Sequence, residues 1–283
     1  MDLNRVIKAR IIFDNQNDIL KMVKSQDAFR RGCNFVSDYI FNNDFPLNAT
    51  ALNKVVYNDL REHFGLKSQM AQSCIRTVVA RYKTVQTQLR KQRVWDGYKK
   101  DNHGKNVKSY INKDLTFIWK PIAFNRPQLD LVRNRDYSYT KDNKMSLNTI
   151  HGRVVVKPIY DGFKQYFDGS WTLGTAKILK SGKHWFMHIA ITKVVDDITM
   201  KPKNVVGIDR GLRQIMTTYD QKGNTVFYSG KQISHKRRNY SRLRKELQSK
   251  NTKSAKRRLK QIGQRESRWM NDVNHCLSKT LVE

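Results

Sequence analysis

The N-terminal part of the chain changes from the pattern of a strand to that of a helix. Apolar and polar side chains alternate from Val6 to Phe13, which is typical of a strand with one buried face. After a polar run at 14–17, apolar residues recur at steps of three and four, and this spacing predicts an amphipathic helix. Two more such stripes follow, with Thr50 and Ser68 as their expected N-caps. The pattern therefore predicts one strand and then a unit of three helices at residues 15–95.

The middle of the chain returns to a strand pattern. Residues 101–148 are polar and interrupted by prolines, so we expect loops and short strands there. From 152 to 192 the period is two, with a Ser181-Gly182 turn between two apolar runs, which predicts a meander of strands. Because the helices separate the first strand from these later ones, the economical architecture is one β-barrel. It would consist of residues 1–14 and 96–200, with a helical insertion.

The last part, residues 203–283, combines a short sheet with basic helices. The apolar run that ends at Asp209 resembles a central strand, with residues 215–219 and 225–228 as its expected antiparallel neighbours. Residues 231–283 contain 16 Lys and Arg against four Asp and Glu. Their apolar positions predict a helix that is capped by Ser254 and reaches Leu281. The fold class is therefore α+β: a barrel with a helical insertion, then a small sheet with long basic helices.

The net charge of the chain favours an anionic partner. The chain has 55 Lys and Arg against 24 Asp and Glu, a formal charge of +31. Basic side chains that neutralise phosphates release condensed counterions, so this composition favours salt-sensitive binding of DNA or RNA over a merely solvated surface. A membrane surface is the lesser polyanion. No run approaches the roughly 18 apolar residues of a membrane span. No secretory signal is visible, and we expect a cytoplasmic protein without a membrane partner.

Several side chains have both a functional and a structural interpretation. One group of aromatic residues near lysines could stack on bases, although such residues more often belong to a core: Tyr160, Phe163, Trp171 and Trp185. The cysteines form no C-x-x-C pair, so we expect no zinc site and interpret them as small buried side chains: Cys33, Cys74 and Cys276.

The expected third helix is basic on its polar sides. Its basic residues are Arg76, Arg81, Lys83, Arg90, Lys91 and Arg93. The short turn at Gly65 before this helix suggests a helix-turn-helix that reads a duplex, but three packed helices without that function are an equal alternative.

Asp209 is the one acidic residue whose position suggests chemistry. An Asp at the end of an apolar strand has a fixed backbone and a carboxylate that leaves the sheet edge, as a metal ligand does. Nucleases with two Mg²⁺ ions need several such carboxylates, and an Asp in this position is more often a turn former. By itself, therefore, the spacing is a weak motif.

The residues around Asp209 add to this motif. They are Val206-Gly207-Ile208-Asp209-Arg210-Gly211-Leu212, followed by Thr217-Thr218-Tyr219-Asp220. Basic helical runs come next, at 236–238, 243–250 and 253–260, and then Asp272-Val273-Asn274-His275. Together with the runs Gly32-Cys33-Asn34-Phe35 and Phe64-Gly65-Leu66-Lys67, these segments resemble the TnpB/OrfB family of insertion-sequence proteins. The resemblance extends over essentially the whole chain.

The resemblance implies a function in transposition-associated DNA cleavage. Members of this family are RNA-guided DNA endonucleases, so the barrel would be a wedge domain that grips a guide RNA, and the helices a recognition lobe that contacts target DNA. Residues 203–283 would be part of an RNase H-like (RuvC) domain, with Asp209 as a catalytic, Mg²⁺-binding carboxylate. The implied nucleic-acid contacts are Ser68, Gln69, Gln72 and Arg76 on the third helix, and Lys236, Arg237, Arg238, Arg242, Arg244, Lys245, Lys256, Arg257, Arg258 and Arg265 on the basic helices.

The sequence also departs from the family pattern. A complete member has a second strand with a catalytic Glu, a zinc ribbon with paired C-x-x-C motifs and a third acid, and we find none of them here. We therefore expect that this chain alone does not cleave DNA, and that Mg²⁺ binds only in a site completed elsewhere, for example by a separate C-terminal fragment. The alternative hypothesis is a non-catalytic, repressor-like nucleic-acid-binding protein.

Overall fold

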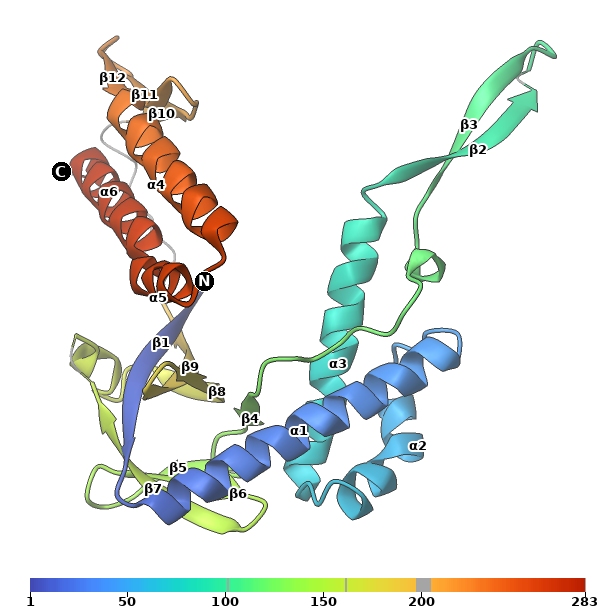
Figure 1. Cartoon of the computed structure of the whole chain (residues 1–283), viewed down its shortest axis with the longest axis vertical. Helices are drawn as coiled ribbons and strands as arrows, with labels where there is room; N and C mark the ends of the chain where they lie inside the picture. The colour runs from blue at the N-terminus through green and yellow to red at the C-terminus, as the bar shows by residue number, and fades with distance from the viewer. Residues whose placement is uncertain (101, 161, 197–204, 283) are drawn as a thin grey trace. The chain divides into compact units, whose positions relative to one another are not determined.

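The first strand, β1 (Asp2–Phe13), lies in the middle of a sheet whose other strands come much later in the chain (Figure 1). The computed structural model describes residues 1–100, 102–160, 162–196 and 205–282, in two compact units, Met1–Asp197 and Ile198–Glu283. The predicted boundaries at residues 200 and 203 fall in 197–204, outside the described residues.

The sheet of the first unit has seven antiparallel strands and is barrel-like. Its order is β4-β8-β9-β1-β7-β6-β5. These are β4 (Leu129–Leu131), β5 (Tyr137–Tyr139), β6 (Met145–Thr149), β7 (Gly152–Ile159), β8 (Thr172–Ser181) and β9 (His184–Val194). The expected hairpin at Ser181-Gly182 joins β8 to β9, which confirms that turn. The predicted simple meander is wrong, because β1 lies between β9 and β7.

The alternation that predicted β1 also determines its register. Ile7, Ala9, Ile11 and Phe13 are buried, and the residues between them are exposed. Ile7 is opposite Ile189 of β9, and Phe13 is opposite Val156 of β7. A shift of one residue would expose this whole apolar set, so burial on one face holds the strand between its two late neighbours.

Three helices follow β1 and share its hydrophobic core. They are α1 (Gln16–Asn42), α2 (Ala49–Glu62) and α3 (Ser68–Leu89). Their buried stripes have the predicted helical period, and the core they form is continuous with that of the sheet. The predicted caps are wrong: Asn48 caps α2 by accepting the N–H groups of Thr50 and Ala51, and α3 begins after Lys67 without a side-chain cap.

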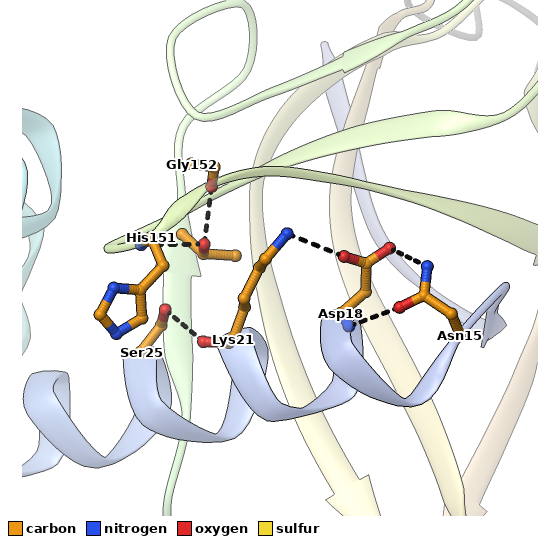
Figure 2. A network of polar contacts seen from close by, with 7 residues as sticks. Asn15, Asp18, Lys21, Ser25, His151 and Gly152 are labelled. Atoms are coloured by element: carbon orange, nitrogen blue, oxygen red, sulfur yellow. Dashed lines mark hydrogen bonds and ion pairs between the residues drawn. The ribbon is translucent and has the colours of Figure 1, made fainter.

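A network of polar contacts fixes the start of α1 against the sheet (Figure 2). The N-cap Asn15 accepts the N–H of Asp18 at 2.8 Å, and the Asp18 carboxylate pairs with Lys21 at 3.2 Å. One turn later, the Ser25 hydroxyl donates to the Lys21 carbonyl and accepts the backbone N–H of Ile150, in the turn between β6 and β7. This buried serine therefore connects the inserted helices to the sheet.

A two-stranded hairpin lies between the helices and the later strands of the sheet. It consists of β2 (Arg93–Lys100) and β3 (Asn106–Asn112), drawn beyond the end of α3 in Figure 1. The predicted helical unit to residue 95 is therefore too long, since α3 ends at Leu89 and Arg93 is in a strand. Short 3₁₀ turns at Leu115–Phe117 and Lys164–Tyr166 complete the unit.

The second unit has a small sheet and three helices. The sheet order is β10-β11-β12, from β10 (Val206–Asp209), β11 (Gln214–Asp220) and β12 (Thr225–Ser229). Among the described residues β10 is an edge strand, which corrects its predicted central position. The helices are α4 (Lys231–Lys250), α5 (Lys253–Ile262) and α6 (Arg265–Val282). The single helix predicted from Ser254 is broken at Gly263, whose φ is +45°, and Thr252 caps α5 instead.

Candidate nucleic-acid interface and acidic position

Asp209 is the last residue of β10 and is exposed. It is opposite Thr217 of β11. The other acid of this sheet, Asp220, is tied to the β11–β12 turn by hydrogen bonds from Asn224, and these bonds lower the pKa of its carboxyl. In the part of the chain that the structure describes, no three His, Cys, Asp or Glu side chains gather closely enough to hold a metal ion. One exposed carboxylate does not fit a two-metal centre.

Two of the predicted binding residues on α4 make an internal ion-pair cluster. Arg237 and Arg244 are seven residues apart, so they lie on the same face of the helix. Arg237 lies 3.6 Å from the carboxylate of Glu266 on α6, and Arg244 contacts the same carboxylate. Lys236 lies 4.3 Å from the centre of the Trp269 ring, also on α6. These three cations hold α4 against α6, and this structural role is one that the charge pattern did not reveal.

The remaining basic residues of the helices are exposed. Arg242 pairs with Glu246 of its own helix at 3.8 Å, and the Arg238 guanidinium donates to the Ser234 carbonyl. In the described residues, no carboxylate lies within ion-pair distance of five others: Lys245, Lys256, Arg257, Arg258 and Arg265.

The face of α5 that packs inward explains why its cations point outward. Ala255 and Ile262 are buried and Leu259 is half-buried, at helical steps of four and three. Lys256, Arg257 and Arg258 fall between these positions and are exposed. Three exposed cations therefore lie together on α5, without an ion-pair partner among the described residues.

The start of α3 presents only part of its predicted binding set. Ser68 is exposed and its hydroxyl accepts from Tyr57, while Gln72 is half-buried. Gln69 is buried, and its side-chain oxygen accepts from Arg135 at 2.8 Å. Arg76 is exposed one turn beyond Gln72. Of this predicted set, Ser68 and Arg76 are therefore exposed to solvent, whereas Gln69 is engaged within the protein.

The match to a known protein family lies mainly in the second unit. Residues 188–283 match the sequence profile of the OrfB_IS605 family, described as "Probable transposase". This segment, 96 of the 283 residues, is similar to the transposase proteins of the TnpB/OrfB family. The matched segment contains Asp209 and all the predicted residues of α4, α5 and α6, whereas Ser68, Gln69, Gln72 and Arg76 lie outside it. No curated protein matches the sequence significantly.

Two solved structures share a weak overall likeness with this chain. One is "Cryo-EM structure of the Cas12f1-sgRNA-target DNA complex", with a TM-score of 0.49, 11% identity, and 92% of this chain and 61% of that chain covered. The other is "Cryo-EM structure of CRISPR-Cas12f Ternary Complex", with a TM-score of 0.40, 11% identity, and 94% and 58% covered. The chain therefore spans about three fifths of the length of these proteins.

Beside α3 the protein has two adjoining pockets that its sequence did not suggest. Both are lined by Arg76, Thr77, Asp130 and Lys177, from α3, β4 and β8. Thr77 donates to the Asp130 carboxylate at 2.7 Å, and the Lys177 ammonium lies 3.6 Å from the other oxygen. Burial raises the pKa of the Asp130 carboxyl, against the opposing effects of Lys177 and Thr77. Asp130 stands alone between two leucines in the sequence, so only the fold brings it to these partners.

The structural interpretation of the large aromatic residues is confirmed. Trp185 is buried and packs edge-on against Phe13 at 5.3 Å, and Trp171 packs against Tyr166. Tyr160 and Phe163 are partly buried against the same core. The prediction of three buried cysteines is wrong for one of them: Cys33 and Cys74 are buried with their sulfurs 3.5 Å apart, while Cys276 is exposed. Of the helices in the described residues, none is both long and apolar enough to cross a membrane.

Proposed function

We propose that this chain binds RNA and DNA as part of a TnpB-like, RNA-guided DNA endonuclease. The observation that carries the proposal is the exposed basic face of α5, inside the segment that matches the transposase family. There Lys256, Arg257 and Arg258 have no ion pair with any acid in the part of the chain that the structure describes. The net charge of +31 supports a polyanionic partner, because each phosphate contact adds counterion release.

The parts of the chain have different roles in this proposal. The barrel-like sheet of β1 and β4 to β9 is the wedge that holds a guide RNA, and the helices α1, α2 and α3 contact target DNA through Ser68 and Arg76. Residues 203–283 belong to an RuvC-like domain in which the basic helices follow a nucleic-acid backbone. Asp209 is one Mg²⁺ ligand of a site that further carboxylates complete, so residues 1–283 alone bind without cutting.

The alternative function is repressor-like binding of duplex DNA without a guide. The same basic surface would serve it, but a binder has no chemical need for Asp209 at the end of its strand. The distinguishing experiment is purification of the chain from its host, followed by sequencing of the RNA that accompanies it. A single defined RNA from a transposon end supports the guide-binding role. Duplex DNA binding without any enriched RNA contradicts it and supports the repressor.

Cleavage tests the assignment of Asp209 separately. The purified chain, supplied with Mg²⁺ and a labelled DNA, should give no products above those of a reaction without protein. Cleavage that disappears in Asp209→Asn would show that this chain already contains a working centre, and would overturn our assignment of an incomplete site.

A further inference from the structure

The hairpin of β2 and β3 exposes apolar and aromatic side chains on both faces. Trp95, Tyr98 and Tyr110 are 55%, 60% and 54% exposed. On the other face Val107 and Ile111 are 50% and 40% exposed. Large aromatic rings are rarely left in water without a partner, so this hairpin is a candidate binding surface.

A β-bulge gathers the three rings on one face. Trp95 is opposite Tyr110, and Tyr98 is opposite Lys108. Three steps along β2 therefore correspond to two steps along β3, so β2 has one extra residue. The extra residue is accommodated at Gly97, whose φ is +93°. Without the bulge, Trp95 and Tyr98 would point to opposite faces, because side chains alternate along a strand. Instead the two rings meet edge to face, with centroids 5.9 Å apart.

The same face carries positive charge. Register places Arg93 opposite Asn112 and Lys100 opposite Asn106, on the face of the rings, together with Lys108. The whole segment 90–113 has eight Lys and Arg against two Asp, a net charge of +6. One of these acids, Asp96, lies 3.4 Å from Lys99. The face therefore combines flat aromatic surfaces with cations and little compensating negative charge.

We propose that this face, made of Arg93, Trp95, Tyr98, Lys100, Lys108 and Tyr110, binds unpaired nucleotides. The rings stack on bases, and the three cations contact the phosphates between them. A duplex hides its base faces, so it offers phosphates to the cations but nothing to the rings. Single-stranded RNA or DNA is therefore the occupant that fits both features. This inference rests on the proposed nucleic-acid-binding function and assigns a second surface to it, apart from α5.

Aromatic substitution tests the stacking. Stacking of one base contributes roughly 1–3 kcal/mol, which corresponds to about 5- to 150-fold in affinity. Trp95→Ala should weaken binding of a fluorescein-labelled 12-nucleotide oligo(U) or oligo(dT) at least about fivefold, whereas Trp95→Phe should recover most of the affinity. Binding of a 20-base-pair duplex should change less than about twofold. The relative affinity for the two oligonucleotides tells whether RNA or DNA is preferred.

The opposite face of the hairpin supplies the matched control. Val107→Ala with Ile111→Ala removes exposed apolar area from the same hairpin and should leave oligonucleotide affinity unchanged. Circular dichroism of every variant checks that the fold is intact. In a second measurement, oligonucleotide should quench the tryptophan fluorescence of the wild type more than that of Trp95→Phe.

The outcomes separate this inference from the proposed function. A wild-type chain that binds neither oligonucleotides nor duplex overturns both. Normal binding that Trp95→Ala leaves unchanged, with no difference in quenching, overturns only the hairpin proposal, and would assign the exposed rings to a protein partner. An equal loss of duplex and oligonucleotide binding would also contradict stacking on unpaired bases.

Discussion

Substitution of Arg257 and Arg258 by alanine tests the proposed binding surface on α5. Both side chains are exposed on α5, and the packing face of this helix is formed by other residues. Alanine favours the helix as well as arginine does, so the double substitution should leave the fold intact. It removes two charges that have no acidic partner in the described part of the chain.

The expected loss follows from counterion release. Each phosphate contact contributes about 0.7 to the slope of log affinity against log salt for a single strand, and about 0.9 for duplex DNA. Loss of two contacts should therefore reduce the slope by about 1.4 or 1.8. At 0.1 M salt this amounts to binding that is about 25-fold weaker for a single strand and about 60-fold weaker for a duplex.

Fluorescence anisotropy titrations at several salt concentrations measure both quantities. Arg30→Ala with Arg31→Ala is the matched control, because these neighbouring arginines also lie on a helix but both pair with Asp27, at 2.7 and 3.1 Å. The control variant loses the same formal charge and should change the slope by much less. Equal losses in the two double variants would refute a localised surface and leave only a general effect of net charge.

Three further predictions concern single residues. Asp209→Asn should leave nucleic-acid affinity within about twofold of wild type, since that carboxylate binds no phosphate; a tenfold change in anisotropy titrations would contradict its assignment. Tyr82→Phe should lower the free energy of unfolding by about 1–3 kcal/mol in urea denaturation, because its hydroxyl donates to the Ser37 carbonyl inside the core; an unchanged midpoint would refute this. Asp130→Asn should raise the melting temperature at pH 7 more than at pH 4.

The sign of the Asp130 effect follows from burial. Because burial raises the pKa of this carboxyl in the folded state, the folded chain binds the proton more readily than the unfolded chain. The contribution of Asp130 to the free energy of unfolding therefore falls as pH rises above its ordinary pKa of 3.8. An Asn side chain stays neutral and avoids this loss. Greater destabilisation by Asp130→Asn at pH 7 than at pH 4 would show that the pair with Lys177 outweighs the burial.

Local periodicity predicted most of the helices and strands, but not how the strands pair in the sheet. The alternation at Val6 to Phe13 and the helical stripes were sufficient for β1, α1, α2 and α3, because each buries one regular face. The position of β1 between β9 and β7 depends on pairing across more than a hundred residues, which no local pattern contains. The hairpin was missed because its bulge breaks the alternation at Gly97, and because a strand exposed on both faces has no apolar period.

For the candidate site, composition predicted the presence of cations but not their neighbours. Lys256, Arg257 and Arg258 are exposed as expected, whereas Arg237 and Arg244 share Glu266 on a helix that lies about twenty residues further along. The side-chain oxygen of Gln69 likewise accepts a hydrogen bond from Arg135, which is remote in sequence. Charge pairing of this kind depends on which helix faces which, and only the folded structure reveals it.

The salt dependence of wild-type binding tests our claim that this chain is a folded cationic scaffold for nucleic acids. Anisotropy titrations with an RNA and a duplex DNA, from 50 to 300 mM salt, should give a linear decrease of log affinity with log salt, with a slope that corresponds to several phosphate contacts. Failure to bind either nucleic acid at the lowest salt concentration, or an affinity that does not respond to salt, would contradict the claim.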